Sequence, residues 1–162
     1  YHAKMWGITY DDLDGWRGPY PAEVFAAQFA KMADAWPPAV DELRRAVEKT
    51  PAERRAAAAA DLRYAEAAGI HFASVANQAS FVLARDALSA SGASAPPAER
   101  TALRDQMRRR LESEIALARR LYTLCGEDSR IGFEPSCHYF YLPQDLVEKV
   151  VNCRWLLDGL RR

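Results

Sequence analysis

Apolar residues recur at steps of three or four through four long stretches of this sequence, near residues 21–49, 50–89, 97–125 and 143–160. Because an α-helix has about 3.6 residues per turn, this spacing places the apolar side chains along one side of each helix. Proline, glycine or small polar residues separate the stretches. The pattern predicts an all-α protein. Because the connections are short, it favours an antiparallel up-and-down bundle of about four long helices.

The first stretch contains two adjacent prolines, Pro37 and Pro38. Proline lacks a backbone donor and disturbs the preceding helical turn. The apolar stripe from Phe25 to Val47 nevertheless keeps its phase across the pair. We therefore expect one helix kinked near Trp36, or two nearly collinear helices.

Several positions in the later helices predict specific contacts. Gly69 marks the close approach of a neighbouring element in the second helix. In the third helix, Arg110 and Glu114 have the spacing of an ion pair on the outer face, as do Asp105 and Arg109. Gly126 predicts the end of that helix. The expected inward residues of the last helix are Leu146, Val150, Cys153, Leu157 and Leu160, with Val147 and Val151 beside them.

Size and charge limit the functions to be considered. The 162 residues fit one helical-bundle domain over residues 1–162. There are 22 Lys and Arg residues and 22 Asp and Glu residues, so the charge favours neither nucleic acid nor an anionic membrane as a partner. The apolar runs are shorter than the roughly 18 residues of a membrane span. Because the sequence begins at Tyr1 rather than methionine, we expect it to be a fragment of a larger protein.

The three cysteines do not have the spacing of a zinc site. Cys125 and Cys153 fall on apolar helix faces, where a buried free thiol is the expected state. A disulfide from Cys137 to either of them is the alternative. We predict no metal and no cofactor.

Two segments lack helical periodicity, and they contain the candidate binding residues. Residues 1–20 contribute Trp16, Arg17 and Tyr20. Residues 127–142 contribute Arg130, Glu134, His138, Tyr139 and Tyr141. Such charged and aromatic groups are suited to a polar ligand or to a neighbouring protein surface. The alternative is that the aromatic rings anchor these segments under the helices. We assign no catalytic residue.

These same segments carry a family resemblance. The sequence RIGFEPSCHYFYLPQDLVEKVVNC, from Arg130 to Cys153, resembles a pattern near the C-terminal end of large bacterial proteins that look like glycoside hydrolases. In those proteins a helical region follows a catalytic barrel. GWRGPYPAEVFAAQFAKMADAW, from Gly15 to Trp36, is similar to the entry into that region. The family pattern tends to have asparagine at the position of Cys137, so no polar role is transferred there.

The resemblance implies a non-catalytic C-terminal helical domain that supports the barrel and edges its sugar cleft. Its partners would be other domains of the same protein and carbohydrate. In that case Trp16, Tyr20 and residues 139–141 should lie together at one end of the bundle. The first alternative is a free-standing interaction module, including a homodimer, which predicts an exposed apolar patch on a helix face. The second is a small enzyme with Glu134 or His138 in a pocket.

Overall fold

The computed structural model describes residues 12–91, 96–134 and 139–161, apart from the side chains of residues 16, 133, 134, 139 and 140. In this part of the chain there are five helices and one short strand pair. The helices are α1 (Leu13–Trp16), α2 (Ala22–Glu48), α3 (Ala52–Ser91), α4 (Pro97–Glu127) and α5 (Pro143–Leu160); the strands are β1 (Phe133–Glu134) and β2 (Tyr139–Phe140). The predicted all-α class is confirmed.

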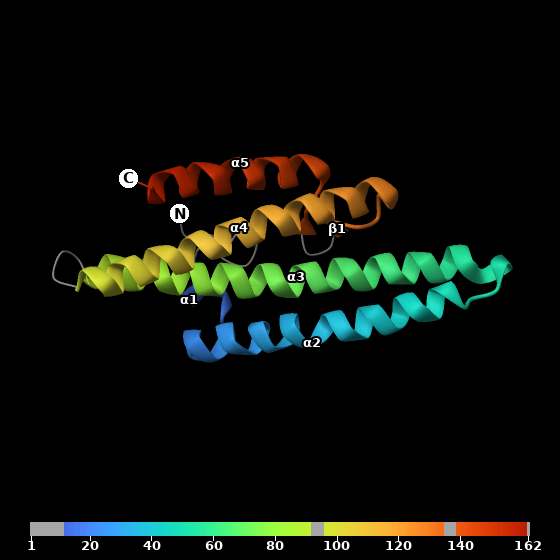
Figure 1. Cartoon of the computed structure of the whole chain (residues 1–162), viewed down its shortest axis with the longest axis horizontal. Helices are drawn as coiled ribbons and strands as arrows, with labels where there is room; N and C mark the ends of the chain where they lie inside the picture. The colour runs from blue at the N-terminus through green and yellow to red at the C-terminus, as the bar shows by residue number, and fades with distance from the viewer. Residues whose placement is uncertain (1–11, 92–95, 135–138, 162) are drawn as a thin grey trace.

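The four long helices pack in chain order, α2 on α3, α3 on α4 and α4 on α5 (Figure 1). Successive helices are antiparallel, since Glu66 of α3 bonds Arg120 of α4 while Ser80 of α3 bonds Gln106 of α4. The predicted up-and-down bundle is therefore confirmed. Figure 1 shows α2 and α5 at the two edges of this arrangement, with α3 and α4 between them.

The ends of the long helices agree closely with the sequence prediction, with one difference at the end of α4. Gly126 does not end α4, because the helix continues to Glu127 and the Asp128 amide donates to the Leu124 carbonyl at 3.0 Å. The short helix α1 was not predicted. It begins where the Asp12 carboxylate accepts from the Gly15 amide at 2.9 Å, which is an ordinary N-terminal cap.

Helix α2 runs without interruption across Pro37 and Pro38. The indole nitrogen of Trp36, in the same turn, donates to the Ala65 carbonyl of α3 at 2.7 Å. The Trp36 ring also meets Phe72 edge to face, with centroids 4.9 Å apart. Trp36 lies so close to Gly69 that a Cβ there would be 2.6 Å from its Cδ1. The predicted close approach at Gly69 is confirmed.

Gly69→Ala is expected to lower the free energy of unfolding by about 1 kcal/mol. Overpacking against Trp36 costs about 1–3 kcal/mol, and the better helix propensity of alanine offsets about 1 kcal/mol of that. Urea denaturation followed by circular dichroism measures the difference. Gly126→Ala is the matched control, because a Cβ at this helical glycine meets nothing within 4 Å. Equal effects of the two substitutions would contradict the assigned contact.

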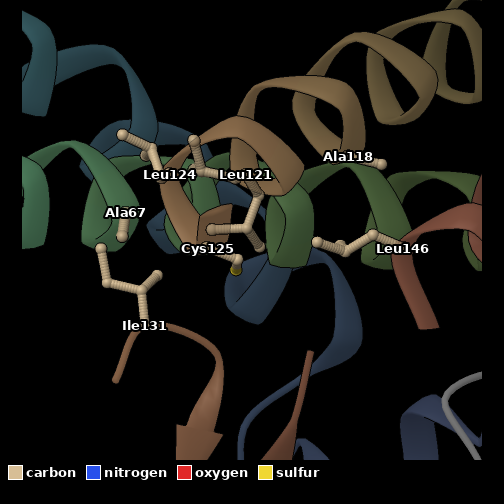
Figure 2. Close-up of a cluster of buried hydrophobic side chains, with 8 residues drawn as sticks. Ala67, Ala118, Leu121, Leu124, Cys125, Ile131 and Leu146 are labelled. Carbon is tan, nitrogen blue, oxygen red and sulfur yellow. The ribbon is translucent and has the colours of Figure 1, made fainter. Parts of the chain in front are cut away.

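The main hydrophobic core lies where α3, α4 and the start of α5 meet, and Figure 2 shows its side chains converging. Leu121, Leu124 and Leu146 are its most completely buried large residues. The other members are Ala67, Ile70, Ala118, Cys125 and Ile131. Cys125 and Cys153 are buried free thiols, as predicted, whereas Cys137 lies outside the described residues.

A second, smaller core attaches α1 to the body of the protein. Leu13 of α1 packs with Ala79 and Val82 of α3, and Phe25 of α2 lies against them. The segment before α2 therefore contacts the C-terminal half of α3.

The helix faces differ from the prediction where α3 is covered on two sides. Phe72 faces Trp36 of α2, while Ser74 and Asn77 are buried facing α4. A single apolar stripe on α3, as predicted, does not account for its contacts with both α2 and α4. The predicted outer-face pair of Arg110 and Glu114 is wrong, because Glu114 is buried in this second contact. Asp105 pairs with Arg108 at 3.0 Å, not with Arg109 as predicted.

Candidate functional site

A buried polar cluster lies at the centre of the α3, α4 and α5 packing, and we call it the Lys149 cluster. Its members are Ser74, Asn77, Glu114, Tyr141 and Lys149. The ammonium Nζ of Lys149 lies 2.6 Å from Oε2 of Glu114. It also donates to Oγ of Ser74 at 2.9 Å and to the hydroxyl of Tyr141 at 3.4 Å. One side chain of α5 therefore contacts α3, α4 and the segment after β2.

Glu114 is the acceptor at the centre of this cluster. Besides Lys149, it accepts from the Ser74 hydroxyl at 2.8 Å and from Nδ2 of Asn77 at 2.9 Å. Its side chain is only 9% exposed. A carboxylate can be buried at low cost only when its charge is paired and its oxygens are hydrogen-bonded, and both conditions hold here.

The electrostatics of the cluster keep Lys149 charged. Burial by itself lowers the pKa of a lysine, but the carboxylate of Glu114 and the hydroxyl of Tyr141 more than offset that effect, so the pKa of Lys149 is raised. A lysine that acts as a nucleophile or base needs a lowered pKa instead. The arrangement is therefore suited to joining three helices rather than to lysine chemistry.

Tyr141 connects the cluster to the segment that follows α4. Its amide donates to the Gly132 carbonyl at 2.6 Å, which extends the β1–β2 pairing by one step. Its ring meets His71 of α3 edge to face, with centroids 5.5 Å apart. Gly132 has a φ of +86°, and a Cβ there would be 2.4 Å from the Tyr141 carbonyl oxygen. Glycine is thus required where this turn closes.

His71 is half-buried beside the same cluster. Burial, reinforced by the positive charge of Lys149, lowers its pKa to about 4. His71 is therefore neutral in the folded protein near pH 7.

Arg130, another predicted residue of the second segment, contacts a carboxylate and an aromatic ring outside the Lys149 cluster. Arg130 pairs with Asp128, with Nη2 at 2.7 Å from Oδ2, and its guanidinium lies 5.5 Å from the Tyr64 ring centre. The hydrogen bonds from the Arg130 side chain and amide lower the pKa of Asp128 to about 2. In the strand pair, the backbones of Glu134 and Tyr139 are partners. Their side chains, and all of His138, lie outside the described residues.

The candidates of the first segment lie near the smaller core. Arg17 bonds Asp14 at 2.6 Å and the Tyr20 carbonyl at 2.5 Å, and the Tyr20 ring is exposed. Trp16 belongs to α1, and its side chain lies outside the described part. Helix α1 contacts α3 at Ala79, and Tyr141 contacts α3 at His71. These two positions on α3 are eight residues apart, which is about 12 Å along the helix. The expected gathering of these aromatic side chains stays a prediction.

A separate ionic contact ties α2, α3 and α4 together. Glu66 of α3 accepts from Arg44 of α2 at 2.8 Å and from Arg120 of α4 at 2.5 Å. Burial raises the pKa of a carboxyl group, but these two guanidinium groups more than offset it and lower the pKa of Glu66. The contact holds the helices in register at a distance from the Lys149 cluster.

Helix α5 also has an apolar side that faces away from the cluster, and we call it the outer face of α5. It consists of Val147, Val151 and Trp155, which are 52%, 62% and 72% exposed. They are four residues apart, so they follow one another along a single side of the helix. The inner side of α5 carries buried Leu146 and Cys153 against the core.

The Lys149 cluster was not predicted from the sequence, and Val147 and Val151 of the outer face were expected beside the inward residues of the last helix. Glu114 follows Leu111 by three residues and precedes Ala118 by four, so a charged residue on the buried side could be detected. Ser74 and Asn77, four and seven residues after Ile70, give the matching polar positions on α3. The sequence contains no comparable sign that Trp155 is exposed. An apolar residue at a helical position looks the same in the sequence whether it packs in the core or lies on a docking surface.

Comparison of the chain with protein-family models, curated proteins and solved structures finds no match. None of the helices in the described part is long and apolar enough to cross a membrane. Among residues 12–91, 96–134 and 139–161, histidine, cysteine and acidic side chains do not form a group of three or more that could hold a metal ion.

Proposed function

We propose that this chain is a non-catalytic helical domain that packs against another protein surface through the outer face of α5. The observation that carries the proposal is the exposed stripe of Val147, Val151 and Trp155. Contiguous exposed apolar side chains are typical of interaction sites, and tryptophan is among the residues that contribute most to binding. The Lys149 cluster supports a structural role, because its charges are satisfied within the protein.

We further propose that the partner is another domain of the same polypeptide, a barrel like those of glycoside hydrolases. This step is supported by the resemblance of Arg130–Cys153, a segment that includes the first half of α5. In that arrangement the residues around β1 and β2 edge the sugar cleft. A self-associating, free-standing module is the second candidate, and it is favoured by the position of the apolar stripe on a helix face.

Trp155→Glu is expected to weaken docking by at least about 2 kcal/mol, as removal of a central tryptophan does at other interfaces. Hydroxyl-radical footprinting should show Trp155 protected in the full-length polypeptide relative to the isolated 162-residue chain. Tyr122→Glu is the matched control, because Tyr122 is an exposed aromatic residue of α4 outside the stripe.

Sedimentation equilibrium of the isolated chain distinguishes the two candidates. Self-association that Trp155→Glu abolishes and Tyr122→Glu retains would identify a second copy as the partner. A monomeric chain, with Trp155 oxidised equally in the chain and in the full-length polypeptide, would reject docking through α5.

The sugar-cleft role requires a saturable thermal shift with an oligosaccharide, and this shift should be lost in His138→Ala and Tyr139→Ala.

A further inference from the structure

Helix α5 has two apolar stripes, and either one could in principle face α4. Val147, Val151 and Trp155 are four residues apart, so each lies about 40° further round the helix than the one before. The inner stripe consists of Leu146, Val150, Cys153 and Leu157, and its centre lies about 130° away from that of the outer face. Apolar patterning alone therefore does not specify which stripe is buried.

Lys149 distinguishes the two orientations. It lies about 160° from the centre of the outer face, almost on the opposite side of the helix. With the inner stripe on the core, its ammonium reaches Glu114 and Ser74. Turning α5 by about 130° to bury the outer face would direct Lys149 to solvent. Glu114 would still be buried against α3, and its carboxylate would then have no counter-charge.

We propose that the buried Glu114–Lys149 pair selects which apolar stripe of α5 packs on the protein and so keeps Val147, Val151 and Trp155 outward. Buried polar pairs are known to fix helix register and orientation elsewhere, because the competing arrangement leaves a polar group unsatisfied. The inference rests on the proposed function only in treating the outward stripe as the docking face. The pair acts on orientation whether or not a partner binds.

Cys153 reports the orientation directly. Cys153 is 6% exposed on the inner stripe, and its thiol would face solvent in the turned helix. Cys125 of α4 is buried as well, and it reports general opening of the core. The test variant Glu114→Gln/Lys149→Met removes both charges with little change of shape. The control Glu148→Gln/Arg154→Met removes the same charges from exposed positions of α5.

Thiol labelling with peptide mapping by mass spectrometry should show Cys153 reacting about tenfold faster in the test variant, with Cys125 unchanged. The control should match the wild type. Adding Val147→Gln and Val151→Gln to the test variant should restore protection of Cys153, because the competing stripe is then polar. Unchanged protection of Cys153 in the test variant would overturn the proposal. Faster labelling of both Cys125 and Cys153 in the test variant, not reversed by Val147→Gln and Val151→Gln, would also overturn it. None of these readings requires a docking partner, so failure here is separate from failure of docking.

Discussion

Lys149→Met should lower the free energy of unfolding by about 3–5 kcal/mol, the largest effect we expect from a single substitution in this protein. The reason is the position of Glu114, whose carboxylate stays buried between α3 and α4 when its counter-charge is removed. The hydrogen bonds from Ser74 and Asn77 remain, but they do not replace the ammonium. Urea denaturation at pH 7, followed by circular dichroism, measures the loss.

The double variant Glu114→Gln/Lys149→Met should recover most of this stability, because no uncompensated charge is then buried. Lys31→Met provides the control for the loss of a lysine, since Lys31 is exposed on α2 and should change stability by less than about 0.5 kcal/mol. A loss below about 1 kcal/mol in Lys149→Met would mean that the ion pair behaves like an exposed one. The pair affects stability and the orientation of α5 separately. The double variant should regain most of the stability but lose the selection of which stripe of α5 is buried.

The long helices could be predicted because each one has a local signal that the fold does not override. Pro97 and Pro143 begin α4 and α5 at the residues where their fixed φ suits a first turn. Gly69 signalled the approach of Trp36 because no other residue leaves that space. Helix α1 was missed because a single turn between Asp12 and Arg17 is too short to show periodicity.

The candidate site could not be predicted in the same way, because its residues come from helices far apart in the sequence. Ser74, Glu114 and Lys149 are joined only by the packing of α3, α4 and α5. The local spacing of Glu114 after Arg110 suggested a surface pair, and long-range packing overrode it. Among the predicted candidates whose side chains are described, Tyr141 is the one that the structure places in the cluster. The role of Tyr141 in the cluster depends on its contact with Lys149. The residues around Tyr141 in the sequence did not indicate that contact.

Acidification from pH 7.5 to 5 should destabilise the protein through His71 by about 1–2 kcal/mol. The pKa of His71 is lowered to about 4 in the folded protein, from an ordinary value of 6.5. Between these values the unfolded chain binds more protons, so stability falls as the pH falls. Well above pH 6.5 the imidazole is neutral in both the folded and the unfolded state, so His71 adds no pH dependence there. The magnitude allows for partial screening by solvent at this half-buried site.

His71→Gln should remove this fall, and urea titrations at several pH values between 5 and 7.5 provide the measurement. That range lies above the region where Glu66 and Asp128 titrate, because the pKa of each is lowered by its arginine partners. Parallel stability curves for the wild type and His71→Gln would contradict the assignment. The double variant Glu114→Gln/Lys149→Met gives a second check, because it removes the nearby positive charge without leaving a buried carboxylate that would itself titrate. The pKa of His71 should then rise toward its ordinary value, so the pH-dependent loss should become smaller.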